Sequence, residues 1–228
     1  MANRPLYIPA TTDNALVHTL PVEFVWSPGM SLAQKQKSIA ALHTAAIDAD
    51  LCKSPLEISS KSPVKLGVSL SAFNLTATTK KQRTFTVESA FQSSKVFENG
   101  GPYTELLYGA SIEAKRDPRI RNSGNLTGFV FFRESWSLEP KTAFYDWLYI
   151  NALHANQRAV KALAEYDAFT DIEFNPKKSI NCQAYSVALY RSLQMRGLIQ
   201  EAMSNKKAYL EIVSRAPPAC IARQKGLS

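Results

Sequence analysis

The chain has 228 residues, of which 45% are hydrophobic and 20% are charged, a composition typical of one globular domain. This balance excludes collagen-like and fully disordered proteins. The formal net charge is +8 at pH 7, from 27 Lys and Arg against 19 Asp and Glu. A basic chain favours encounter with polyanions such as nucleic acids, although net charge does not determine a fold.

The cysteines and histidines are too scattered to form an evident metal site. Cys52, Cys182 and Cys220 are odd in number and far apart, so neither a disulfide framework nor a Cys-x-x-Cys site can be drawn. We therefore expect no metal and no cofactor. The N-terminus lacks an apolar signal segment, and every apolar stretch is much shorter than the roughly 20 residues that span a bilayer. We expect a cytoplasmic protein that does not contact the membrane.

The first 50 residues predict an arm followed by a helix. Residues 1–30 contain four prolines and little helical periodicity, and the likeliest strand there covers 20–26. Ser31 and Gln34 then have the spacing of a capping box, which predicts a helix over 32–48. We expect residues 1–50 to pack as an arm and helix on the rest of the chain.

The segment that follows is polar, basic and broken by prolines. Residues 53–83 contain six Lys or Arg and one Glu, and a short strand at 67–70 is expected inside this long loop. The basic stretch is either a solvated loop or a surface that faces phosphates. In the second case Lys80, Lys81 and Arg83 are the expected nucleic-acid contacts.

The rest of the chain has mostly helical patterns. We therefore predict a mainly α fold, α+β with a few short strands, that forms a compact single domain. Residues 51–214 are its expected catalytic part, and 215–228 a basic, disordered tail. The expected elements are helices at 86–97, 103–108 and 111–116, a strand or buried turn at 128–133, helices after Pro140, a helix from 179 or 180 to 197, and a last helix at 198–214.

One polar stripe of the helix expected at 86–97 groups a carboxylate, an amide and an amine. Glu88, Gln92 and Lys95 are spaced i, i+4 and i+7, which places them within about 60° on a helix. A carboxylate can move protons in glycoside chemistry, and a neutral amine can attack an anomeric carbon or an aldehyde. The alternative is an ordinary solvated helix face.

Two further segments have weaker chemical signals. Asp171 lies ten residues before Asn181, and an Asp in a loop next to a helix N-terminus can orient a ribose or a water while amides around 180–182 hold a phosphate. The alternative is a simple cap. In the other segment, Phe73 can stack on a base and Ser71 can hydrogen-bond a sugar or phosphate. Core packing of Phe73 is the competing interpretation.

Together these segments resemble the NADAR family. Residues 87–97 resemble its E-x-x-[YF]-Q-x-x-K-[AFV] helix, and 69–73 look like its F-S-N-F segment with Ala72 in place of Asn. Asp171 with the helix that contains Asn181, Tyr185 and Arg191 is similar to the family's Asp and its N-x-L-G-x-x-L-M-x-x-R helix, with Ala for Gly at position 184. The resemblance covers about 66–197. The N-terminal arm and residues 166–176 look like the bacterial branch of NADAR antitoxins encoded beside DarT-type DNA ADP-ribosyltransferases.

This resemblance implies a glycohydrolase that removes ADP-ribose from guanine bases of DNA and so reverses the toxin. It implies a compact, mainly α fold, with ADP-ribosylated DNA as substrate and the cognate toxin as a further partner. Glu88 and Lys95 would be catalytic, and Asp171 would orient ribose or water. The implied substrate contacts are Ser71, Phe73, Gln92, Asn181, Tyr185 and Arg191.

Two alternative functions remain open at the level of sequence. One is an N-glycosidase of a small nucleotide or ADP-ribose conjugate, which would act without DNA and with little salt dependence. The other is a non-catalytic antitoxin that sequesters the toxin or covers DNA, which would protect stoichiometrically even after Lys95→Ala. Within the enzymatic hypothesis, a Glu88/Asp171 carboxylate pair competes with imine formation at Lys95.

Overall fold

Three β-sheets run through the computed structural model, which describes residues 1–12, 14–177, 179–215 and 219–220. The chain is therefore mixed α+β, and the expectation of a mainly α fold is wrong. Most of the strands that were missed have only two or three residues, and some of them pair over long distances in sequence. Local hydrophobic periodicity does not predict such pairing.

The N-terminal arm forms the centre of the largest sheet. β1 (Ala2–Pro9) and β2 (Val17–Phe24) make an antiparallel hairpin, and β1 also pairs with β9 (Ala168–Thr170). β3 (Pro55–Glu57) lies parallel to β9 at one edge, and β10 (Ala219–Cys220) lies parallel to β2 at the other. The strand order is β10-β2-β1-β9-β3.

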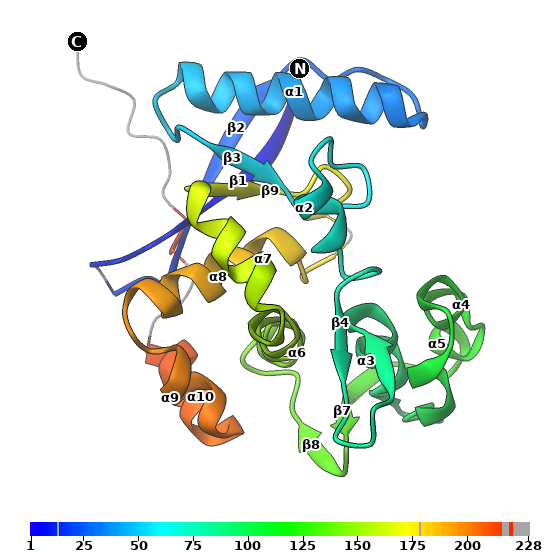
Figure 1. Ribbon diagram of the computed structural model, residues 1–228. Coiled ribbons are helices and arrows are strands. Elements are labelled where there is room, and N and C mark those ends of the chain that lie inside the picture. The colour runs from blue at the N-terminus through cyan, green and yellow to red at the C-terminus, as the bar shows by residue number, and fades with distance from the viewer. Residues whose placement is uncertain (13, 178, 216–218, 221–228) are drawn as a thin grey trace.

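Helices cover both faces of this sheet, as Figure 1 shows with α1 (Leu32–Asp48) above it and α8 (Gln183–Met195) below it. Neighbouring residues of a strand point to opposite faces. Accordingly Leu6 joins the core under α1, whereas Tyr7 joins the main core with α8. The expected helix at 32–48 is confirmed, and the side chain of Ser31 caps it by accepting from the amide of Gln34.

A second layer holds the smaller sheets and most of the aromatic core. In it Phe129 stacks on Phe144 with ring centroids 4.7 Å apart. The elements of the chain not yet named are α2 (Lys65–Ser69), β4 (Thr76–Thr78), β5 (Thr84–Thr86), α3 (Val87–Ser93), β6 (Lys95–Phe97), η1 (Thr104–Tyr108), α4 (Ser111–Arg116), α5 (Arg119–Asn122), β7 (Leu126–Phe131), β8 (Glu134–Trp136), α6 (Ala143–Ala155), α7 (Gln157–Ala162), η2 (Leu163–Glu165), α9 (Ile199–Ser204) and α10 (Lys206–Arg215).

Several expected boundaries are corrected by the structure. The strand expected at 67–70 is wrong because α2 occupies that position. Gly67 lets α2 approach β3 closely, since a Cβ at this position would lie 1.9 Å from the carbonyl oxygen of Glu57. The helix expected to begin at 179 or 180 starts instead at Gln183, and the last helix is divided into α9 and α10.

The C-terminal expectation can be compared only in part. Residues 216–218 and 221–228 of the expected disordered tail lie outside the described residues, and Ala219–Cys220 pair with β2. Among the described helices, none combines the length and apolar character needed to cross a membrane.

Candidate functional site

A cavity of about 900 Å³ opens between α3, the start of α6 and the segment that joins β9 to α8. This volume falls within the roughly 300–1,000 Å³ of small-molecule sites. It gathers titratable side chains from parts of the chain far apart in sequence. Those that line it are Glu88, Lys95, Lys115, Glu139, Lys141, Asp171, Glu173 and Lys177.

Glu88 is held by the first turn of α3. Thr86 caps this helix reciprocally with Ser89, and the capping fixes where the helix begins. Gln92 donates to Glu88, with Nε2 2.9 Å from Oε1, as their i, i+4 spacing predicts. The other amide atom, Oε1 of Gln92, is buried and has no hydrogen-bond partner among the described residues. The site thus presents a carboxylate and an unsatisfied acceptor together.

Lys95 reaches the same cavity from a strand and not from the helix. α3 ends at Ser93, and Lys95 begins β6, where it pairs with Phe129 of β7. The expectation that a helix continues to 97 is therefore wrong. The hydroxyls of Ser93 and Ser94 both bond back to the carbonyl of Ala90, and such bonds favour the end of a helix.

The amine of Lys95 is in a poorly hydrated position. Its Nζ lies 4.8 Å from the ring centre of Phe91, which is itself buried. Burial lowers the pKa of Lys95 to about 8; the charge of Glu88 raises it, and the charge of Lys115 lowers it. With such a pKa, about one amine in ten is neutral at pH 7.

Lys115 enters from α4 and contacts two expected site residues at once. Its Nζ lies 3.6 Å from Oε1 of Glu88 and 4.9 Å from the ring centre of Phe73. The side chain is 54% exposed, against 7% for that of Glu88. Lys115 therefore forms an outer boundary of the site that ion-pairs with the buried carboxylate.

Asp171 lies on the opposite wall of the cavity. Its Oδ1 accepts from the amides of Glu173 and Phe174, so the carboxylate organises the turn that follows β9. Gln183 at the start of α8 also hydrogen-bonds Asp171, while its own Oε1 accepts from the amide of Ala72 at 2.7 Å. Burial raises the pKa of Asp171 well above the usual range, and the charge of Glu57 raises it further.

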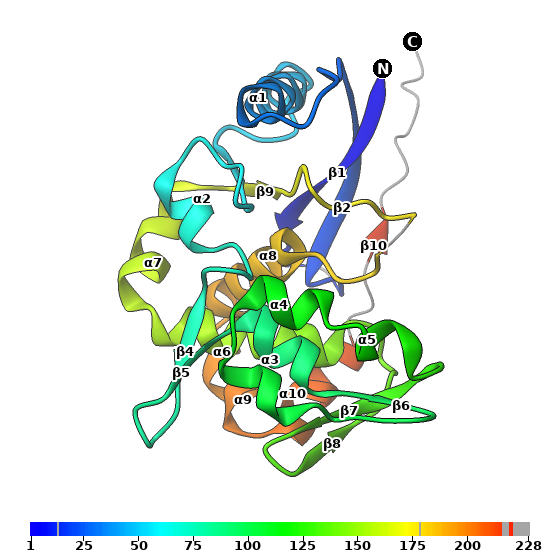
Figure 2. The same cartoon turned by 90° about the vertical axis from the view of Figure 1, so that its right-hand side faces the viewer.

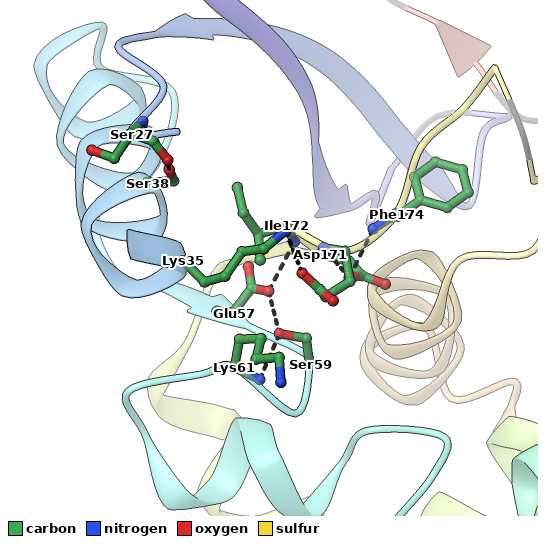
Figure 3. Close-up of polar contacts among 10 residues, drawn as sticks. Ser27, Lys35, Ser38, Glu57, Ser59, Lys61, Asp171, Ile172 and Phe174 are labelled. Carbon is green, nitrogen blue, oxygen red and sulfur yellow. Dashed lines mark hydrogen bonds and ion pairs between the residues drawn. The ribbon is translucent and has the colours of Figure 1, made fainter. Parts of the chain in front are cut away.

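Glu57 is a second buried carboxyl behind Asp171 (Figure 3). It accepts from the hydroxyl of Ser59 at 2.6 Å, from the amide of Ile172 at 2.8 Å and from the hydroxyl of Thr170 at 2.7 Å. Burial raises the pKa of Glu57. One carboxyl thus fixes both residues that flank Asp171 in the chain.

The structure places the other expected substrate contacts in different regions. Phe73, Gln92 and Asn181 line the main cavity. Ser71 is buried and does not line it, and its oxygen accepts from the amide of Phe73. Arg191 also lies elsewhere and donates to Gln194.

Tyr185 lines a neighbouring cavity, with its ring edge-on to Tyr7. The amides around 180–182 precede α8, so they are not the first turn of a helix.

The basic residues chosen from sequence lie apart from the main cavity. Lys80, Lys81 and Arg83 lie in the connection between β4 and β5 of the hairpin and line a separate hollow with Phe85, Tyr108 and Phe132. Arg83 stacks on Tyr108, with Cζ 3.4 Å from the ring centre. In Figure 2 this hairpin projects on the side away from α5 and from the segment that follows β9.

Sequence reasoning missed three residues that shape the site: Glu57, Lys115 and Gln183. Glu57 had a usable signal, because it is a lone acid between Leu56 and Ile58. Buried charged residues are rare and require partners. Lys115 had no such signal, since only the tertiary position of α4 brings it to Glu88.

The fold and cavity define a mixed α+β domain with a site that combines a buried carboxylate with a partly buried amine. Residues 2–219 match the model of the DarT1-associated NADAR antitoxin family, and the chain belongs to that family. The family assignment confirms the resemblance found in the sequence. Its name associates this antitoxin with a DarT1 toxin. No similar sequence was found among curated proteins.

Proposed function

We propose that this protein is a glycohydrolase that removes ADP-ribose from guanine bases of DNA and thereby reverses the action of a DarT-type toxin. The observation that carries the proposal is the partly buried amine of Lys95, whose pKa is lowered by desolvation to about 8, in one cavity with Glu88. A neutral lysine is a nucleophile for anomeric carbons. The assignment to the DarT1-associated family supports ADP-ribosylated DNA as the substrate.

In the proposed first half-reaction Lys95 replaces guanine at C1″ of the distal ribose. The ring opens, the neutral amine bonds to C1″, and the bond from C1″ to the guanine nitrogen breaks. The amine loses two protons as the imine forms: one goes to the ring oxygen O4″, which becomes a hydroxyl, and Glu88 takes the other and returns it to the departing guanine. The products of this step are an unmodified guanine within the DNA and an imine between Lys95 and ADP-ribose.

In the second half-reaction water hydrolyses the imine. Water adds to C1″, the bond to Lys95 breaks, and free ADP-ribose leaves with the amine restored. Asp171, on the opposite wall, orients the ribose or this water. Burial raises the pKa of Asp171, which favours a protonated carboxyl that can donate to a ribose oxygen.

Exposed lysines at the cavity suit a substrate that carries a pyrophosphate and a phosphate backbone. Lys115, Lys141 and Lys177 line it with exposed side chains. Glu173, also on this wall, is paired with Lys35 at 2.8 Å, so its charge is already compensated. Phosphate contacts of this kind supply affinity and position without reading sequence.

The test is to trap the intermediate. Borohydride added during turnover of ADP-ribosylated guanine DNA should reduce the imine and leave ADP-ribose attached to Lys95, as mass spectrometry of the peptide with Phe91 to Phe97 would show. Lys95→Arg keeps the positive charge but cannot form the adduct. Turnover without an adduct, or an active Lys95→Arg, would favour the Glu88/Asp171 pair instead.

Glu88→Gln separates catalysis from binding. Gln retains the size of the side chain, so ADP-ribose should still bind while turnover falls by about 100-fold or more. Protection of DNA that survives both Glu88→Gln and Lys95→Arg would identify a stoichiometric antitoxin. Equal activity on a mononucleotide conjugate, with no dependence on salt, would identify a small-molecule N-glycosidase.

A further inference from the structure

A second cavity of about 490 Å³ adjoins the main one. Residues 140–143 and the segment from Phe174 to Ile180 contribute to the lining of both. The additional walls come from β1, β2, α8 and α10, and they are mostly apolar. They include Tyr7, Leu16, Tyr185, Leu189, Tyr209 and Val213.

Polar groups meet at one place in this apolar pocket. Asp146 is buried, lines the pocket and accepts from the hydroxyls of Ser186 at 2.5 Å and Thr142 at 2.7 Å. Burial, and secondarily the charge of Asp146, raise the pKa of both Tyr185 and Tyr209. An apolar cavity with a few converging polar groups is the usual form of a ligand site.

The hydroxyl of Tyr209 has no hydrogen-bond partner among the described residues. Tyr209 itself is fully buried. Leaving a buried hydroxyl unsatisfied is unfavourable, so this one indicates a partner other than the described residues.

We propose that this second cavity binds a purine base with an exocyclic amine, as an extension of the main site. This inference rests on the proposed function, because ADP-ribose and guanine each provide such a base. The carboxyl of Asp146 would accept from the amine, and the hydroxyl of Tyr209 would donate to a ring nitrogen or to a base oxygen. The rings of Tyr7 and Tyr185 would pack against the base.

The shared walls explain how one substrate reaches both cavities. The same segments that line the base pocket also carry Lys141 and Lys177, which line the main cavity. ADP-ribose can therefore place its base in the second cavity and its phosphates beside these lysines. Its distal ribose then lies toward Glu88 and Lys95.

The test measures binding of AMP and of GMP to the full-length protein by calorimetry, with Tyr209→Phe as the key variant. Removing an unpartnered buried hydroxyl should leave the Tm unchanged or raise it by a few degrees, yet weaken nucleotide binding about 10-fold. The matched control is Tyr149→Phe. Tyr149 is also fully buried, but its hydroxyl donates to the carbonyl of Leu70, so this variant should lower the Tm and leave nucleotide affinity intact.

Each outcome decides the inference. Weaker binding of AMP alone in Tyr209→Phe assigns the pocket to the adenine of ADP-ribose, and weaker binding of GMP alone assigns it to the target guanine. If neither nucleotide binds, or if Tyr209→Phe binds as the wild type does, the inference is wrong and Tyr209 faces a buried water. Because binding needs no turnover, a protein without glycohydrolase activity would leave this result intact.

Discussion

Lys115 pairs with Glu88 across the mouth of the main cavity, with Nζ 3.6 Å from Oε1. The pairing links two charges that act on Lys95 in opposite directions, because Glu88 raises the pKa of Lys95 and Lys115 lowers it. Burial is the largest cause of the lowered pKa, and Lys115 adds to it. The exposed Lys115 therefore increases the fraction of Lys95 that is neutral.

Replacing Lys115 should move the pH dependence of catalysis. In Lys115→Gln the charge that opposes protonation of Lys95 is lost, so the pKa of Lys95 rises above about 8. Activity that depends on the neutral amine then rises at higher pH, and kcat at pH 7 falls several-fold. The kcat–pH profile measures this shift. Lys115→Arg should keep the wild-type profile. An unshifted profile in Lys115→Gln would show that the charge of Lys115 does not control the pKa of Lys95.

Glu57 should influence the alkaline limb of the same profile through the pKa of Asp171. Its charge raises the pKa of Asp171, so Glu57→Gln should lower that pKa and move the alkaline limb of kcat, where Asp171 loses its proton, to lower pH. Gln keeps an oxygen for the amide of Ile172, so the Tm should change by only a few degrees.

A purely structural role of Glu57 predicts a different result. Loss of folded protein would lower kcat at every pH and leave the shape of the profile unchanged. Glu57→Asp serves as the control because it retains the charge. The three profiles, together with the Tm of each variant, separate the two roles.

Glu88, Gln92 and Lys95 do line one cavity, although the sequence predicted their geometry only in part. Glu88 and Gln92 lie on one helix, and their contact follows from local spacing. Lys95 reaches the cavity from β6, so its i+7 relation to Glu88 was the wrong reason for grouping them. The pairing of β6 with β7, some thirty residues later, determines the direction of Lys95. A local pattern does not encode that pairing.

The strand pairing of the large sheet could not be predicted from the sequence for a similar reason. β3 and β9 have three residues each and are separated by more than one hundred positions, yet they pair side by side. Segments of three residues show too little alternation to predict a strand. By contrast, the helix over 32–48 was predictable because its cap and its period are both local.

Two groups of basic residues should have separable effects on DNA. Lys141→Gln with Lys177→Gln, at the main cavity, should raise KM for ADP-ribosylated DNA and for a mononucleotide conjugate alike. Lys80→Gln with Lys81→Gln, at the separate hollow, should weaken only DNA binding and reduce its salt slope by about 1 to 2. Titrations at several salt concentrations measure both effects. If the Lys80/Lys81 pair changes neither substrate, the hairpin is a solvated loop.

Asp146 should make the stability of the fold depend on pH. Burial raises its pKa from 3.8 to about 7, so the folded state binds this proton more tightly than the unfolded state does. The resulting stabilisation is complete below pH 4 and is lost as the pH rises through 7, by about 4 kcal/mol in total. Asp146→Asn cannot titrate, so its free energy of unfolding should lack this decline. Ser186→Ala removes a hydrogen bond that lowers the pKa of Asp146 in the folded state. The decline in the free energy of unfolding should therefore extend to higher pH. Urea unfolding between pH 4 and 8.5 compares the three proteins, and parallel curves for wild type and Asp146→Asn would show that Asp146 remains ionised in the folded state.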